Sequence, residues 1–304
     1  MRLDEDYLRE LELWPMFALQ QRAMAIHDSA QLGQQANRID TSPVAPLTVG
    51  QAFVPTPNPM PGIIQPLKRA ASATSAPANT TPARPAVVIP FDAERAARIA
   101  GLDWAGLEAE AANCKACSLC KQRKQAVLGA GAKNAPWLFI GEGPGSEEDQ
   151  QGEPFVGQAG KLLDAMLVAT GLQRGREVYV ANVVKCHPPG NRTPTTAEAA
   201  ACAPFLDRQM VLIQPKLLVA LGKTAAIRLT QSTEKTLSEN SMASLRGSSH
   251  TYTLQGQPIA FMATYHPAYL LRNPSDKLKV WEDLLRAKKI MSTMIIQAQP
   301  DAHS

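Results

Sequence analysis

The C-terminal two-thirds of the chain alternate short, continuous apolar runs with helical patterns, and this alternation restricts the fold more than any other feature. The apolar runs are residues 137–140, 178–184, 217–221 and 259–263. Apolar residues at helical spacing are found at 160–170, 196–213, 223–231 and 276–297. Strands without polar alternation are typical of a parallel sheet that helices cover on both faces. The pattern therefore predicts an α/β fold of three layers, α/β/α, around a central, mostly parallel four-stranded sheet.

The first ninety residues follow a different pattern. Apolar residues at helical spacing over the first 14 positions predict an amphipathic helix, which Pro15 must end or kink. The following stretch is rich in Pro, Ala, Ser and Thr without periodicity, as expected of a disordered linker. We therefore expect a disordered N-terminal extension before the folded domain. The expected boundaries are a helical segment at 1–30, a linker at 31–90 and a folded domain at 91–297.

Charge and hydropathy narrow the class of protein. The chain has 304 residues and a net charge of +4, and beyond residue 104 it carries 22 lysines and arginines against 17 aspartates and glutamates. A face that binds nucleic acid would therefore lie in the C-terminal two-thirds. No segment has the roughly 20 apolar residues that span a bilayer, and the acidic N-terminus lacks the basic start of a secretory signal. The sequence predicts a cytoplasmic protein without membrane association.

All five cysteines lie between Cys114 and Cys202, and in a reducing compartment such clustering favours metal binding or catalysis over disulfides. Cys114 and Cys117 form a CxxC pair, Cys186 closely follows the second apolar run, and Cys202 lies in the following helix. Two close and two distant cysteines can form a four-thiolate site for zinc or an iron–sulfur cluster, and their spacing does not choose between them. Buried apolar cysteines are the alternative. Cys120 is a third member of the CKACSLC run.

A glycine-rich loop, Gly141–Gly145 (GEGPG), follows the first apolar run. Ligands bind at the carboxyl ends of strands in parallel sheets, and three glycines in five residues suit close approach of the backbone to a ligand. The loop lacks the Lys-Ser/Thr of a P-loop and departs from the dinucleotide fingerprint, so a plain tight turn is the alternative. Glu142 would repel a phosphate, and it fits better with a site that orients water or a base.

The segment HPAYLLR begins with His266, directly after the last apolar run. A histidine at this place has either a structural or a functional role. Leu270 and Leu271 beside Arg272 suit a loop that enters a DNA groove and replaces a flipped base. The alternative for the two leucines is the first turn of a helix packed on the core.

Together these motifs resemble family 4 of the uracil-DNA glycosylases, the iron–sulfur branch of that superfamily. The resemblance runs from about Cys114 to Lys289 and is carried by the joint, ordered occurrence of its motifs. The motifs are CKAC, LFIGEGPGSEED, GEPFVGQAGKLLD, VYVANVVKCHPPGNRTP, EAAACAPFLDRQ, LVALGKTAA and YHPAYLLRNPS. The resemblance implies that 91–297 is the catalytic domain of a DNA repair enzyme. Such an enzyme flips uracil out of DNA and hydrolyses its N-glycosidic bond, so uracil-containing DNA is the expected partner.

The resemblance also implies a cofactor and two catalytic residues. The four ligands of a [4Fe–4S] cluster would be Cys114, Cys117, Cys186 and Cys202. Cys120 has no counterpart among these ligands. Glu142 would orient the attacking water, and His266 would donate a hydrogen bond to uracil O2 as negative charge develops there.

Four further residues match positions that bind the base in this family. Gly143 would lie against the flipped uracil, Phe155 would stack on its ring, and Asn182 would bind its pyrimidine edge. Glu148 would guard the C5 side of the ring against a thymine methyl group. Leu270, Leu271 and Arg272 remain the expected DNA-binding segment.

The chain also departs from relatives within the superfamily. A branch that links covalently to the abasic sugar has Gln in place of Gly143 and a basic insert with a nucleophilic histidine. This chain instead runs through CHPPGNRTP, so His187 does not match that nucleophile. The N-terminal 90 residues depart from the compact family pattern. The apolar face of their helix fits docking to another repair or replication protein, and docking on the catalytic domain itself is the alternative. Two alternatives are a glycosylase for another deaminated base, such as hypoxanthine, and a non-catalytic accessory protein that associates with DNA or a polymerase.

Overall fold

The structure is a computed structural model of the chain, and it describes residues 92–230 and 241–297. The expected N-terminal helical segment (1–30) and linker (31–90) lie outside the described residues. None of the described helices is long and apolar enough to cross a membrane.

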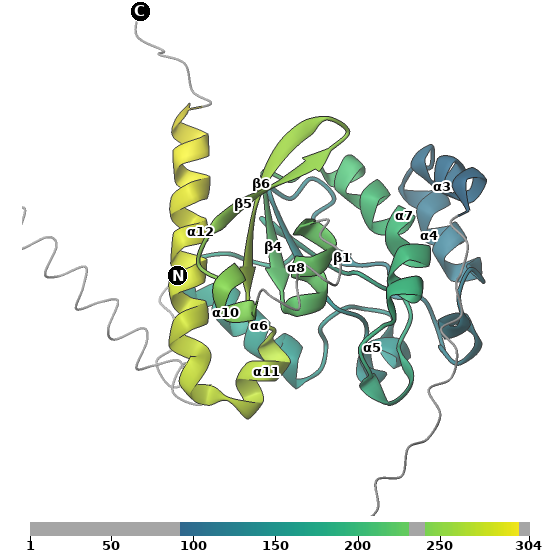
Figure 1. Cartoon of the computed structure of the whole chain (residues 1–304), viewed down its shortest axis with the longest axis horizontal. Coiled ribbons are helices and arrows are strands. Elements are labelled where there is room, and N and C mark those ends of the chain that lie inside the picture. The colour runs from purple at the N-terminus through teal and green to yellow at the C-terminus, as the bar shows by residue number, and fades with distance from the viewer. Residues whose placement is uncertain (1–91, 231–240, 298–304) are drawn as a thin grey trace, which may run out of the picture. The chain divides into compact units, whose positions relative to one another are not determined.

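A six-stranded sheet forms the centre of the described part (Figure 1). The strands in spatial order are β1 (Ala130–Gly131), β3 (Val178–Asn182), β2 (Trp137–Gly141), β4 (Leu217–Leu221), β6 (Gln257–Thr264) and β5 (Ser249–Leu254). The four central strands pair in parallel, and each edge strand pairs antiparallel with its neighbour. The four expected apolar runs are these parallel strands. The expected number of four is corrected to six, because the edge strands lack a continuous apolar run.

Helices cover both faces of the sheet, which confirms the three-layer α/β/α arrangement. Successive side chains of a strand point to opposite faces, so Leu138 and Ile140 of β2 join one core while Trp137 and Phe139 join the other. The first core is covered by α3 (Ala93–Ala100), α4 (Trp104–Asn113), α7 (Thr196–Ile213) and α8 (Lys223–Thr230). The second is covered by α6 (Gln158–Ala169), α11 (Pro267–Arg272) and α12 (Lys277–Gln297).

Short helices connect some of the larger elements within the described residues. They are η1 (Ser118–Lys121), α5 (Ser146–Gln151), η2 (Pro189–Asn191), α10 (Met242–Leu245) and η3 (Pro274–Asp276). From β2 the chain continues to β3, its neighbour toward one edge of the sheet. From β4 it continues to β6, its neighbour toward the opposite edge. Ligands of open α/β sheets bind beside the carboxyl ends of the strands at such a change of direction. The sheet order therefore places a binding site where the loops after β2, β4 and β6 meet.

Candidate active site and cysteine pocket

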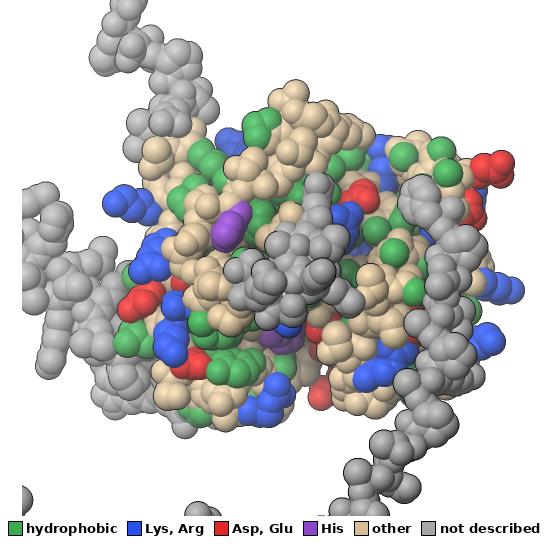
Figure 2. Space-filling model, viewed as in Figure 1, with side chains coloured by type: hydrophobic (Ala, Val, Ile, Leu, Met, Phe, Trp, Pro, Cys, Tyr) green, Lys and Arg blue, Asp and Glu red, His purple; other side chains and the backbone are tan. Residues whose placement is uncertain are grey.

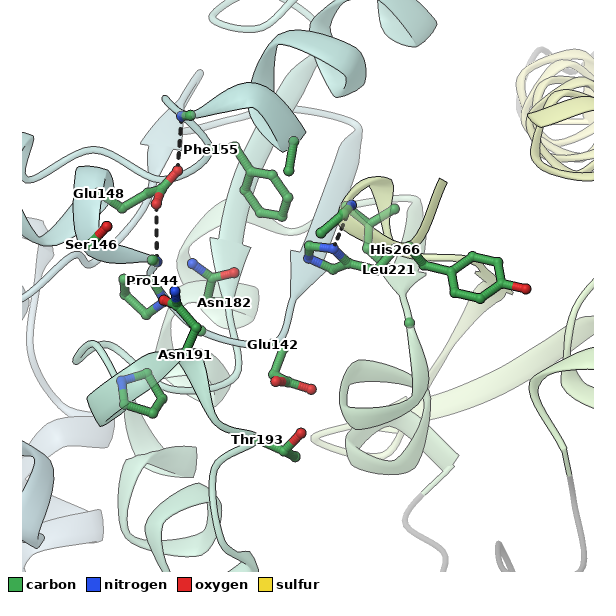
Figure 3. A pocket seen from close by; sticks show the side chains of 18 of the residues that line it. Glu142, Pro144, Ser146, Glu148, Phe155, Asn182, Asn191, Thr193, Leu221 and His266 are labelled. Carbon is green, nitrogen blue, oxygen red and sulfur yellow. Dashed lines mark hydrogen bonds between the residues drawn. The ribbon is translucent and has the colours of Figure 1, made fainter. Parts of the chain in front are cut away.

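A cleft of about 540 Å³ opens at this change of direction, and its lining joins loops that lie far apart in the sequence (Figure 3). The lining includes all six residues that the sequence assigns to catalysis or base binding. These are Glu142, Gly143, Glu148, Phe155, Asn182 and His266. The fold therefore brings the complete expected pocket together.

Phe155 and His266 form two walls of the cleft. Their ring centroids are 5.5 Å apart with an interplanar angle of 29°, and both side chains face the space that Asn182 enters from below (Figure 3). Phe155 has a φ of +57°, a left-handed conformation that is unfavourable for a bulky residue. Arg174 stabilises this turn by donating to the carbonyl oxygens of Pro154 at 2.7 Å and Phe155 at 3.2 Å. Such strain at a pocket is typical of a functional position.

Asn182 ends β3 at the floor of the cleft, and its side chain is almost fully buried, with 1% exposed. Its Oδ1 atom has no hydrogen-bond partner among the described residues. Leaving a buried polar atom unpaired is energetically unfavourable, by roughly 1–3 kcal/mol, so this oxygen is placed to accept from a ligand. A Cβ atom on Gly141 would come within 2.4 Å of Oδ1. The glycine of the GEGPG loop is therefore what leaves room for the amide.

His266 precedes α11 as its N-cap residue. Its Nδ1 accepts a hydrogen bond from the backbone N–H of Ala268 at 3.1 Å, so in the neutral ring the proton lies on Nε2. Burial, together with the positive charge of Arg272, lowers the pKa of His266 to about 4. At neutral pH the ring is therefore an uncharged donor with a fixed tautomer.

Glu142 and Gly143 form the part of the cleft that follows β2. The Glu142 carboxylate accepts a hydrogen bond from the hydroxyl of Thr224, in the first turn of α8. A Cβ atom at Gly143 would lie 2.8 Å from Cγ2 of Val184. Position 143 therefore has no space for a side chain unless Val184 shifts. The hydrogen bond from Thr224 holds the Glu142 carboxylate in place.

Glu148 connects two walls of the cleft. Its carboxylate accepts from the backbone N–H groups of Gly145 at 3.0 Å, Val156 at 2.9 Å and Gly157 at 3.1 Å. These contacts tie the loop after β2 to the turn that carries Phe155. The expected role of Glu148 as a guard against a thymine methyl group stays a prediction, and the geometry adds a role in holding the loops.

The expected DNA-binding segment needs one correction. Leu270 has no exposed surface and packs in the core that α6 and α12 cover, so its assignment to the DNA surface is wrong. The short helix α11 turns this residue toward the sheet, as the alternative of a core-packed turn describes. Leu271 is 47% exposed and Arg272 lines the cleft, so both stay candidates for DNA contact. Lys and Arg side chains on the face in Figure 2 are scattered rather than gathered in one stripe.

A second, much smaller pocket of about 10 Å³ is lined by all five cysteines. Cys186 and Cys202 are buried, and the other three are half-buried. As the side chains lie, no three metal-binding residues of the described ranges are grouped so that they could hold an ion. Burial raises the pKa of Cys117 to about 11 and of Cys202 to about 12, so without a metal both would be uncharged thiols.

Donors surround these sulfur atoms. Arg123 donates to Sγ of Cys186 at 2.9 Å, Arg95 donates to Sγ of Cys114 at 3.4 Å, and the backbone N–H of residue 185 donates to Sγ of Cys202 at 3.3 Å. Hydrogen bonds to the ligand sulfurs and nearby positive charge stabilise a cluster that is bound by four thiolates. The chemistry of the donor set therefore fits an iron–sulfur cluster.

The sequence patterns did not identify some residues that the structure places beside the two sites. Lys185 is buried beside the cysteines, and its amine donates to the backbone carbonyl of Asn182 at 2.7 Å. Arg192 lines the cleft and forms a bidentate ion pair with Glu198. The pattern T-x-x-E at 195–198 is typical of a helix capping box and could have indicated the start of α7. The ion pair between Arg192 and Glu198 could not be predicted from this pattern, because it depends on the fold.

Comparison with known proteins decides the family. The model of the uracil DNA glycosylase superfamily matches residues 128–285, a range that includes the six expected pocket residues. The chain belongs to this superfamily. A type-4 uracil-DNA glycosylase of Thermotoga maritima is 43% identical over 186 residues, which cover 59% of the chain and 89% of the relative. A type-4 uracil-DNA glycosylase of Sulfurisphaera tokodaii is 39% identical over 188 residues, 62% of the chain and 84% of the relative.

The type-5 branch of the superfamily is a more distant match. A type-5 uracil-DNA glycosylase of Pyrobaculum aerophilum is 32% identical over 98 residues, which cover 31% of the chain and 38% of the relative. The type-4 matches extend over most of each relative, whereas this one does not. The resemblance to family 4 that the motifs indicate is therefore confirmed.

Proposed function

We infer that this uracil-DNA glycosylase superfamily member removes uracil from DNA by hydrolysing the N-glycosidic bond, which leaves an abasic site for base excision repair. The observation that carries this inference is the unpaired Oδ1 of Asn182, which lies beside the Phe155 and His266 rings in a chain whose type-4 relatives are named uracil-DNA glycosylases. The cleft lies at the carboxyl ends of parallel strands, where such a site is expected.

The base must leave the duplex before it reaches this cleft, at a cost of a few kcal/mol. We propose that the flipped uracil stacks on Phe155 and that the Asn182 amide binds its edge, because an amide offers both a donor and an acceptor. The buried Oδ1 atom then gains the partner that it lacks. A base without an N–H donor at that edge would leave that oxygen unpaired.

Bond cleavage moves the electron pair of the glycosidic bond onto the uracil ring, so negative charge develops on O2 while the sugar becomes positive. We propose that the Nε2–H of neutral His266 donates to O2, and one such donor contributes roughly 3–4 kcal/mol in other enzymes. Water then adds to C1′ and releases a proton. Glu142, held by Thr224, is the acidic group that we propose to orient this water.

We propose that Cys114, Cys117, Cys186 and Cys202 bind a [4Fe–4S] cluster. The supporting observations are the shared pocket and the N–H donors that point at three of these sulfurs. When bound, the cluster would supply a cross-link between the segment after α4, the end of β3 and α7. Its role in this proposal is structural.

The partners and the location follow from the function. Uracil-containing DNA is the proposed partner, with Leu271 and Arg272 at the rim of the cleft as contacts, and the cytoplasm is the proposed compartment. The N-terminal helical segment is proposed to dock on another repair or replication protein, and it lies outside the described residues.

An oligonucleotide assay tests the proposed function. Iron-loaded protein is incubated with a duplex that contains one uracil and with matched duplexes that contain thymine or hypoxanthine, and abasic sites are cleaved with alkali. Excision of uracil alone is the expected result. Excision of hypoxanthine in place of uracil would indicate the other deaminated base, and DNA binding without base release would indicate an accessory protein.

A further inference from the structure

Glu198 lies between the cysteine pocket and the cleft, and its carboxylate is fully engaged. It is in the first turn of α7, and only 4% of its side chain is exposed. Arg192 donates to both oxygens, at 2.7 and 2.8 Å. Ser118 donates from its hydroxyl at 3.0 Å and Thr195 from its backbone N–H at 2.9 Å. Four hydrogen bonds from three residues, which lie in two segments of the chain, therefore converge on one carboxylate.

These partners belong to the two sites described above. Ser118 directly follows Cys117 and begins η1, the turn that also carries Cys120. Arg192 lines the cleft next to Asn191, and 42% of its side chain remains exposed. Cys202 lies on α7 one turn beyond Glu198, on the helix that lines the cysteine pocket. The carboxylate is thus a direct bridge between the cysteine segment and the cleft wall at 187–193.

The Glu198 carboxylate stays negatively charged at neutral pH. The hydrogen bonds from Arg192 lower the pKa of Glu198 to about 2, against the opposing effect of burial, with Thr195 and Ser118 adding to the lowering. A bidentate pair of arginine and carboxylate has one preferred geometry. Arg192 is therefore held in a single orientation at the edge of the cleft.

We propose that Glu198 is a positioning residue that fixes the wall at 187–193 against the cysteine segment so that this wall is preformed for DNA. The proposal rests on the proposed function. Phe155, Asn182 and His266 take no part in the network, so the chemical step is expected to stay intact when the bridge is cut. Capture of DNA is expected to weaken, because a wall that must be ordered on binding lowers affinity.

Two variants cut the bridge at different points. Ser118→Ala removes only the bond from the cysteine segment and leaves the Arg192 pair in place. Glu198→Gln keeps the size of the side chain and removes the charge. The matched control is Thr195→Ala, which removes the capping hydroxyl that accepts from the backbone N–H of Glu198 at 3.2 Å but leaves every bond to the carboxylate.

Each variant is measured as the iron-loaded full chain on the uracil duplex, with KM, kcat, iron per chain and Tm recorded. Ser118→Ala should raise KM about three- to tenfold, as expected for the loss of one hydrogen bond to a charged group, with kcat within about twofold and iron unchanged. Glu198→Gln should raise KM at least as much. Thr195→Ala should lower Tm by about 2–4 °C, the usual effect of losing one cap, and leave KM unchanged.

The outcomes separate this proposal from the proposed function. A wild-type protein that releases no uracil overturns the function itself. With an active wild type, an unchanged KM in Ser118→Ala overturns the bridge, and so does a fall in kcat at constant KM. A rise in KM that comes with loss of iron also overturns it, because Ser118 would then act through the cysteines. If Glu198→Gln fails to fold, Ser118→Ala alone decides.

Discussion

The cleft and the cysteine pocket lie at the same end of β3, yet they are built in opposite ways. The cleft has a volume of about 540 Å³ and contains an amide oxygen without a partner among the described residues. The cysteine pocket has a volume of about 10 Å³, and the sulfurs of Cys114, Cys186 and Cys202 already accept hydrogen bonds. Asn182 and Cys186 are four residues apart. The first site has room for a large group to enter and leave, whereas the second has little free volume, as the proposed structural cluster would require.

Removing one ligand of the proposed cluster should have the largest effect. Cys186→Ser is expected to lose the iron and to lower Tm strongly, because metal binding contributes directly to folding free energy. Cys120→Ser is the matched control, since Cys120 lines the same pocket but has no ligand role in the proposal, and it should keep its iron. Iron and zinc analysis of both proteins checks this, and zinc without iron in the wild type would contradict the cluster.

Removing the amide of Asn182 should have the next largest effect. Asn182→Ala is expected to lower single-turnover excision about 100-fold or more, as for other donors aimed at a reacting group, while DNA affinity stays nearly constant because phosphate contacts dominate it. Gln158→Ala is a matched control, since Gln158 is also an amide side chain that lines the cleft, but it is exposed at the start of α6 and lies outside the wall at 187–193. Equal losses in the two variants would show that Asn182 has no special role.

The pH dependence of excision should show a smaller effect. Burial lowers the pKa of His266 to about 4, so the neutral donor predominates from about one pH unit above this value and is lost as pH falls through 4. Single-turnover excision should therefore be flat from about pH 6 to 8 and fall about twofold near pH 4. A rate that increases as pH falls through 6.5 would show that the protonated ring is the active form.

Deleting residues 1–90 should have the smallest effect. The sequence places every motif of the two sites after this region, so the truncated protein is expected to keep its iron and its kcat/KM. Limited proteolysis of the full chain should cut between residues 40 and 90 and leave a stable C-terminal fragment. Aggregation of that fragment, or loss of uracil excision, would show that the N-terminal helix belongs to the catalytic core.

Much of the fold could be predicted because its information is local. Four continuous apolar runs define the four parallel strands, and the helical patterns between and after them define α6, α7, α8 and α12, whereas α3 and α4 were not predicted. The edge strands escaped prediction for physical reasons: β1 has two residues, and β5 leaves most of its side chains partly or fully exposed. A short strand, or one paired at the edge of a sheet, needs little apolar sequence.

In the candidate site, too, the features that depend on local sequence could be predicted, and those that depend on the fold could not. The motifs predicted the pocket residues, and the structure places all six in one cleft. The neutral tautomer of His266 could not be predicted, because it depends on the burial of the ring and on its hydrogen bond with Ala268. The bridge through Glu198 could not be predicted either, because Ser118 and Glu198 are 80 positions apart and only the fold brings them together. Leu270 was misplaced because a wedge and a core-packed turn share the same apolar letters, and burial alone distinguishes them.

The left-handed turn at Phe155 also limits how the protein could be engineered for heat resistance. A glycine would relax the backbone at this position, since it adopts positive φ without penalty, but it would remove the ring that faces His266. Gly160 offers no alternative adjustment, because a Cβ atom there would lie 1.9 Å from the carbonyl oxygen of Phe155. Substitutions that raise thermal stability at this turn are therefore expected to lower activity. Stabilising substitutions are better sought at positions distant from it.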